Sequence, residues 1–207
     1  MPRVAHRHEA PPSPRPPRTK AAARPYRPRR LVLRDGREVV QRAIAPADAA
    51  EIVQAFERLS ATSRYHRFMQ HRSRLDEAAV ERGTHPRPGL DFTFVATIPA
   101  PDGIDIVGAA QYVGPRDAAG AAGLICEFAV TLAEDWRGSG LACTLMKSLL
   151  RRARRDGYAA MEGWILAENA PMLALARRLG FRIERDAGDA TVMRALRTLQ
   201  RPQPAHL

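Results

Sequence analysis

Between residues 92 and 132 the chain carries three apolar segments that leave few choices of fold. They are Phe92–Ile98, Ile104–Val113 and Leu124–Leu132, and the turn-rich stretches Pro99–Gly103 and Gly114–Gly123 separate them. Short apolar runs bounded by glycine and proline are typical of β-strands in a core. We therefore expect three successive antiparallel strands here.

The residues before these strands predict a hairpin followed by a helix. Arg30–Leu33 and Arg37–Ile44 are apolar-alternating runs joined by Asp35-Gly36, a dipeptide that tolerates the positive φ of a tight hairpin turn. Asp48, with Glu51 three residues later, has the spacing of a capping box at a helix start. A second short helix is expected at Leu75–Arg82.

After the three strands, helix and strand patterns alternate. A helical apolar face begins at Leu141, and Gly157 ends it. The remaining expected elements are a strand at Met161–Leu166, a helix at Pro171–Leu179 and strands at Phe181–Arg185 and Thr191–Leu196. Together these patterns predict one α+β domain over residues 31–198, with a C-terminal tail at 199–207.

Residues 1–30 differ from the rest in composition. They hold nine Arg or Lys and one acid, so eight of the eleven net positive charges lie there, with eight of the 17 prolines. Such a segment cannot bury enough apolar surface to close a core, and we expect it to be disordered. The remainder is close to neutral, so nucleic-acid binding is not expected beyond weak binding through this tail.

The sequence also favours a cytoplasmic protein without membrane contact. No run approaches the roughly 20 apolar residues that a membrane helix needs, and the N-terminus lacks the apolar core of a secretion signal. Cys126 and Cys143 are too few for a disulfide framework. No Cys/His spacing typical of zinc appears, and no metal is expected.

A glycine-containing turn, Arg137–Ala142, lies between the third central strand and the long helix. Small residues let the backbone approach a ligand, and the free N–H groups of a helix's first turn, with its dipole, favour an anion. A pyrophosphate fits such a turn. A tight connection without any ligand explains the same pattern equally well.

The spacing within this turn resembles a known family. Arg137-x-x-Gly140-x-Ala142 is similar to the acyl-CoA pyrophosphate loop of the GNAT superfamily of N-acetyltransferases, and Asn169 followed by Gly180-Phe181 is similar to its motif B. Further phrases resemble the acetyltransferase domain of bacterial protein lysine acetyltransferases: Asp35-Gly36-Arg37, Ser63–Met69, Glu127-Phe128-Ala129-Val130 and Asn169–Leu173. The resemblance covers roughly residues 30–185.

The resemblance implies a mostly antiparallel mixed sheet flanked by helices, with a splayed parallel strand pair that holds acetyl-CoA. It places the pantetheine arm on the backbone around Val130 and Leu132. Asn169 is implied either as a contact near the pantetheine or as a helix cap. The pyrophosphate is implied on the residues Arg137, Gly138, Ser139, Gly140, Leu141 and Ala142.

Glu127 is the candidate general base. It interrupts an apolar strand, where burial would raise the pKa of its carboxyl toward the working range of a base; the resemblance implies the same role. An ion pair with Arg64 or Arg67 is the alternative. Many family members carry a tyrosine acid seven residues after the motif-B Asn, but this chain has Ala176 there.

The expected activity is direct transfer of acetyl from acetyl-CoA to an amine, with a protein lysine as the preferred acceptor. A small-molecule amine is one alternative. A non-catalytic acyl-CoA sensor tethered by its basic tail is another. The segment Arg64–Met69 is expected near the acceptor entrance, where its arginines either shape the substrate mouth or are simply solvated.

Overall fold

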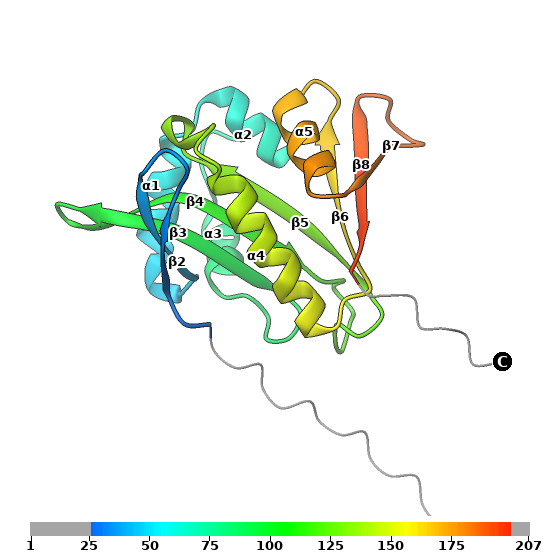
Figure 1. The fold of residues 1–207 in the computed structure, drawn as a ribbon, viewed down its shortest axis with the longest axis horizontal. Coiled ribbons are helices and arrows are strands. Elements are labelled where there is room, and N and C mark those ends of the chain that lie inside the picture. The colour runs from blue at the N-terminus through cyan, green and yellow to red at the C-terminus, as the bar shows by residue number, and fades with distance from the viewer. Residues whose placement is uncertain (1–25, 200–207) are drawn as a thin grey trace, which may run out of the picture.

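Eight strands form one sheet in the part of the chain that the computed structural model describes, residues 26–199 (Figure 1). The strands are β1 (Arg29–Val32), β2 (Glu38–Ala43), β3 (Phe92–Ala100), β4 (Gly103–Val113), β5 (Ile125–Leu132), β6 (Ala160–Leu166), β7 (Arg182–Arg185) and β8 (Val192–Thr198). The helices are α1 (Ala49–Glu57), α2 (Ala61–Phe68), α3 (Glu77–Thr84), α4 (Leu141–Asp156) and α5 (Ala170–Arg178).

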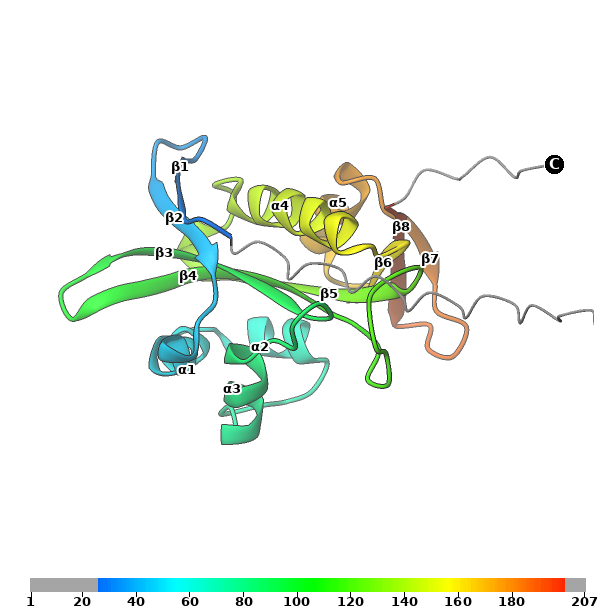
Figure 2. The same cartoon turned by 90° about the horizontal axis from the view of Figure 1, so that it is seen from below.

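The sheet is mixed and mostly antiparallel, as the sequence predicted. Its order is β1-β2-β3-β4-β5-β6-β8-β7, and only β5 and β6 run parallel. Helices α4 and α5 cover one face, and α1, α2 and α3 cover the other (Figure 2). The three central strands expected from the apolar runs are antiparallel neighbours, and the α+β fold class is confirmed.

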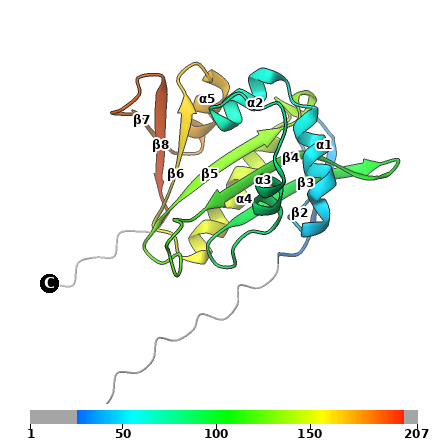
Figure 3. The same cartoon turned by 180° about the vertical axis from the view of Figure 1, so that it is seen from behind.

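The parallel pair separates along its length. β5 and β6 pair over only three residues, from Ile125 opposite Ala160 to Glu127 opposite Glu162. Both strands continue for several residues beyond the last pair, and Figure 3 shows them diverging. The expected splay is therefore present, and it begins directly after Glu127.

Aromatic packing accompanies this separation. The Phe128 ring lies so close to Gly163 of β6 that a Cβ at Gly163 would come within 2.7 Å of it. The Phe128 and Phe181 ring centroids are 4.9 Å apart. The Phe128 ring therefore lies between β5 and β6, on the α5 side of the sheet, where their pairing stops. Gly163 leaves room for this ring because it has no Cβ.

Helix α4 anchors the centre of the sheet. It begins after Gly140 and ends before Gly157, both in the left-handed conformation. Leu141, Leu145 and Leu149 are fully buried on its inner face; burying each such side chain stabilises the fold by about 1.5–3 kcal/mol. The N-terminus of α4 is thus held firmly at the open end of the parallel pair.

The β1–β2 hairpin closes onto the loop before α4. Gly36 has a φ of +84°, as the hairpin turn requires. Arg37 then donates a hydrogen bond to the Asp135 carbonyl oxygen at 3.0 Å, and its guanidinium lies 4.1 Å from the Trp136 ring centroid. These contacts fix the hairpin tip on the α4 side of the sheet.

Apart from α2, which forms where no element was predicted, two local predictions need correction. Asp48 precedes α1 but makes no side-chain cap; its carboxylate instead accepts from the Ala45 N–H at 2.8 Å and from the Arg42 guanidinium at 2.6 Å. The second short helix spans Glu77–Thr84 rather than 75–82, because Asp76 caps it by accepting from the Ala79 N–H. In both cases one carboxylate's hydrogen bonds decide the local structure.

Residues 1–30 were predicted to be disordered. Residues 1–25 of this segment lie outside the described residues, and strand β1 begins within it, at Arg29. Most of the predicted C-terminal tail, 200–207, lies outside them as well, while Leu199 is buried. Within residues 26–199 no helix is long and apolar enough to cross a membrane.

Candidate active site

The loop before α4 has the conformation that its glycines predict. Gly138 and Gly140 have φ values of +77° and +91°. The Ser139 hydroxyl donates to the Trp136 carbonyl oxygen at 2.7 Å and accepts from the Leu141 N–H at 3.2 Å. Leu141 therefore offers no free N–H to a ligand, and its side chain belongs to the core.

Other N–H groups of this turn remain available. Within residues 26–199, those of Gly140, Ala142 and Cys143 make no hydrogen bond. They lie at the N-terminus of a 16-residue helix, where the helix dipole favours negative charge. The turn thus fits the pyrophosphate predicted for it.

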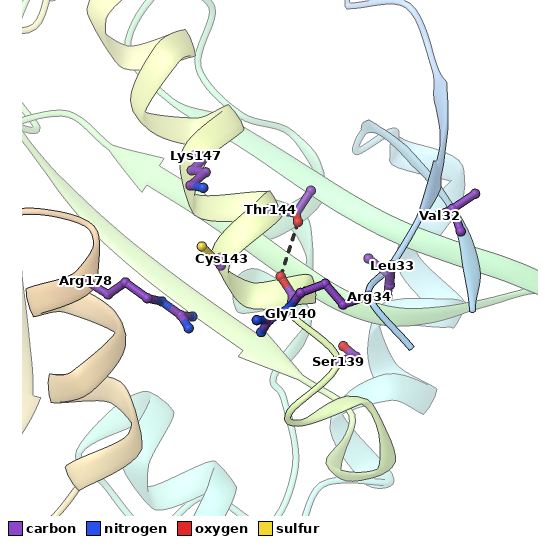
Figure 4. Close-up of a pocket in the computed structure, with 9 residues that line it drawn as sticks. All are labelled: Val32, Leu33, Arg34, Ser139, Gly140, Cys143, Thr144, Lys147 and Arg178. Atoms are coloured by element: carbon purple, nitrogen blue, oxygen red, sulfur yellow. Dashed lines mark hydrogen bonds between the residues drawn. The ribbon is translucent and has the colours of Figure 1, made fainter. Parts of the chain in front are cut away.

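Beside this turn is a pocket of about 340 Å³ that carries three cations (Figure 4). Arg34 comes from the hairpin tip, Lys147 from α4 and Arg178 from α5, and all three side chains are exposed. The Arg34 guanidinium lies over Gly140, where a Cβ would be 3.1 Å from Nε. We call this site the cation pocket, and it is suited to the phosphates of a nucleotide.

Arg137 lies in the predicted loop, and its side chain makes contacts with helix α2 and Glu134. Its Nη2 donates to the Ser63 Oγ at 2.6 Å and lies 3.7 Å from the Glu134 carboxylate. Hydrogen bonds from Ser60 and Ser63 lower the pKa of Glu134 to about 2. The Arg137 side chain therefore joins the loop to helix α2 and does not point into the cation pocket.

Glu127 lies at the last paired position of β5, on the sheet face that α2 covers. We call this side the Glu127 face. The residue remains exposed to solvent, and its carboxylate makes no hydrogen bond and no ion pair within 4.0 Å in the described part of the chain. Desolvation by the surrounding protein raises the pKa of Glu127, Arg67 acts to lower it, and Glu162 acts to raise it.

The ion-pair alternative for Glu127 is not formed. Arg64 donates instead to the carbonyl oxygens of Glu57 and Ser73, at 2.7 and 3.1 Å. Arg67 is near enough to influence Glu127 electrostatically, but the two side chains make no ion pair. The carboxylate thus remains free to accept a proton.

Two further residues of the Glu127 face were not predicted. Glu162 is opposite Glu127 in the parallel pair, and Arg194 of β8 donates to its carboxylate at 2.5 and 2.8 Å. Trp164 is 38% exposed one strand repeat further along β6. These residues come from β6 and β8, which lie beside β5 only in the folded sheet. No local sequence motif therefore marks them.

The motif-B residues have structural roles. The Asn169 side chain accepts from the Met172 N–H at 3.2 Å and caps α5, which is one of its two predicted roles. Ala176 is fully buried, so the position of the missing tyrosine offers no proton donor. Val130 and Leu132 lie on β5 beyond the last pair with β6, half-buried, where the pantetheine arm was expected.

The splayed parallel pair, the glycine turn before α4 and the unpaired Glu127 carboxylate are arranged as the resemblance to acetyl-CoA-dependent acetyltransferases implies. A family model for the acetyltransferase (GNAT) domain matches residues 39–182. The chain therefore belongs to the GNAT acetyltransferase family. It is an N-acetyltransferase, and acetyl-CoA is its co-substrate. Among residues 26–199 no group of three or more potential metal ligands gathers.

Similar proteins agree with this placement. An acetyltransferase of Pseudomonas aeruginosa is 33% identical over 159 residues, which cover 77% of this chain and 83% of the relative. An L-methionine sulfoximine/L-methionine sulfone acetyltransferase of the same species is 38% identical over 79 residues, covering 38% of this chain and 45% of that protein. The solved GNAT domain of S. lividans PAT has a TM-score of 0.74 and 25% identity, over 83% of this chain and 97% of that domain.

Proposed function

We propose that this enzyme acetylates a lysine side chain of a protein, with Glu127 as the general base. The observation that carries the proposal is the position of Glu127 at the point where β5 and β6 separate, unpaired and accessible from the α2 side. The likeness to the GNAT domain of S. lividans PAT over nearly all of that domain supports it.

A general base is needed because the acceptor amine is protonated at neutral pH. A lysine amine has a reference pKa of about 10.4, so only about one in 10³ is neutral at pH 7. Glu127 takes one proton from the ammonium, the neutral nitrogen bonds to the thioester carbonyl carbon, and the second proton of that nitrogen passes to water. The carbon–sulfur bond then breaks, and the CoA thiolate leaves with a proton from water, since Ala176 supplies none. The transfer is direct and forms no acyl-enzyme.

The donor occupies the other side of the splay in this proposal. The unpaired edge of β5 around Val130 and Leu132 receives the pantetheine arm, and the N–H groups of Gly140 and Ala142 receive the pyrophosphate. The cation pocket lies next to that turn and takes the remaining negative charge of the nucleotide. Alignment of the two substrates supplies much of the rate, as in other reactions without covalent catalysis.

The test is CoA release from acetyl-CoA by the purified protein with three acceptors: none, a panel of small amines, and a protein fraction from a lysate followed by mass spectrometry of lysines. Protein-dependent release, lost in Glu127→Gln, supports the proposal. Release with small amines alone contradicts the lysine assignment. Acetyl-CoA binding with no release in any arm favours a sensor, with residues 1–30 as its tether.

A small-molecule acceptor is the second candidate, favoured by one observation. The relative that shares 38% identity over 79 residues is named for two amino-acid derivatives.

We further propose a reducing, cytoplasmic location, because both cysteines are free and Cys126 is buried, with its thiol pKa raised to about 12 by desolvation.

A further inference from the structure

The last turn of α2 carries an arginine whose partners are missing. Arg67 is half-buried, and its guanidinium lies over the Phe68 ring, 4.8 Å from the centroid. A guanidinium has five N–H donors. The guanidinium of Arg67 nevertheless makes no hydrogen bond and no ion pair with any residue in the described range. None of its nitrogens is a fully buried unpaired atom, so each keeps some exposure to solvent.

Neighbouring arginines show that this is particular to Arg67. Arg64, one turn earlier in α2, donates to two backbone carbonyl oxygens. Arg72, after the helix, lies 3.7 Å from the Asp76 carboxylate. Arg67 alone of these three presents a guanidinium without a hydrogen bond or ion pair, and its helix packs against the strand of the candidate base.

The charges around Arg67 favour an added anion. Burial lowers the pKa of Arg67 to about 10, with a contribution from nearby Arg72, so the group is still cationic at neutral pH. Both guanidiniums lie over the same Phe68 ring. Glu127 is the one carboxylate that acts on Arg67, and it is beyond ion-pair distance. A carboxylate would therefore find a planar, unsatisfied cation here.

We propose that Arg67 binds a carboxylate carried by the acceptor, next to the amine that Glu127 deprotonates. The inference rests on the proposed function and narrows its substrate class. Helix α2, which carries Arg67, packs against β5, which carries Glu127, and the two side chains form no ion pair with each other. An acceptor bound between them would present its amine to the Glu127 carboxylate and its own carboxylate to the Arg67 guanidinium. Arginine pairs with carboxylates through two parallel hydrogen bonds, which fixes orientation.

The carboxylate has two sources that share this chemistry. It is either an acidic side chain near the target lysine of a protein or the α-carboxylate of a free amino acid. The first source is probed with two lysine peptides that differ only in Glu or Gln beside the lysine. The second is probed with L-leucine against 3-methylbutylamine, which is the same molecule without the carboxylate.

In wild-type protein, kcat/KM is expected to be about 10-fold or more higher for the carboxylate-bearing member of at least one pair, mainly through KM. Arg67→Gln should bring that ratio close to one, and Arg67→Lys should restore only part of it. The matched control, Arg74→Gln, changes an exposed arginine just beyond α2 and should keep the wild-type ratio.

Two results would overturn the inference: no preference in wild-type protein, or a preference that survives in Arg67→Gln. Where Arg67→Gln fails to fold, Arg67→Lys keeps the charge but not the paired hydrogen bonds, and a full wild-type ratio in that variant would equally overturn the inference. Acetylation of lysine peptides without preference overturns the role of Arg67 and leaves the proposed function intact. Failure to acetylate any amine overturns both.

Discussion

The two faces of the sheet use charge in different ways. The cation pocket on the α4 side gathers three positive side chains, and no acidic residue lines it. The Glu127 face carries both signs of charge: Arg67 acts electrostatically on Glu127, and Arg194 is hydrogen-bonded to Glu162. A polyanionic nucleotide needs only an excess of positive charge, whereas proton transfer needs one carboxylate left unneutralised among balanced neighbours. The comparison predicts separable losses of chemistry and of donor binding.

The largest effect is expected from Glu127→Gln. Because the amide cannot accept the proton, kcat should fall by about 10²–10⁴-fold, while the acetyl-CoA dissociation constant from calorimetry stays near the wild-type value. Glu184→Gln, an exposed strand carboxylate on β7, is the matched control and should keep full activity. A fall of less than tenfold would remove Glu127 from the role of base.

The converse loss is expected in the cation pocket. Arg34→Gln and Arg178→Gln should each weaken acetyl-CoA binding about 10-fold at low salt, and less at high salt because the side chains are exposed. Their effect on kcat at saturating donor should be small. Arg177→Gln, the exposed neighbour in α5, is the control. Equal weakening by Arg177→Gln would show a general charge effect instead of a site.

Ser63 connects helix α2, on the acceptor side, with the loop before α4, on the donor side. Replacing it tests whether acceptor binding and donor binding are independent. Its hydroxyl accepts from Arg137 of the loop and donates to Glu134 at 2.6 Å. Ser63→Ala removes both bonds, and we expect KM for acetyl-CoA and KM for the acceptor to rise together by about 3- to 5-fold. Ser73→Ala, an exposed serine after α2, is the control. A rise in only one KM would mean that the sides act separately.

The smallest effect is a shift in pH dependence. Glu127 acts as base when deprotonated, and its raised pKa means that kcat/KM increases as pH rises through a value above the ordinary range. Glu162 raises that pKa, so Glu162→Gln should move the rising limb to lower pH by less than about one unit. A limb that does not move, measured with one acceptor throughout, would contradict the coupling.

The glycine loop could be predicted from the sequence, whereas the cation pocket could not. The loop from Arg137 to Ala142 is contiguous, and its glycines dictate a conformation that any reader of the chain can expect. The cation pocket joins residues 34, 147 and 178, which are far apart in the sequence and meet where the hairpin lies against the loop before α4, with Arg37 over Trp136. No local pattern encodes that docking.

Prediction also failed where one side chain had two suitable partners. Asp48 has the sequence context of a helix cap, but Arg42 lies within reach six residues earlier and draws its carboxylate into an ion pair. Glu127 was identified because a carboxylate in an apolar strand stands out in the sequence. Arg67 stood out less, because an arginine in a polar helix is ordinary until its missing partners are seen.

The splay leaves the sheet one strand short at its centre. β5 and β6 each expose an edge beyond residues 127 and 162, and a donor that lies along the β5 edge fills this gap. Ligand that binds only the folded state stabilises it by about 2.7 kcal/mol at a hundred times its dissociation constant. The enzyme's resistance to unfolding, and with it its lifetime in a cell that degrades unfolded chains, should therefore follow the supply of acetyl-CoA.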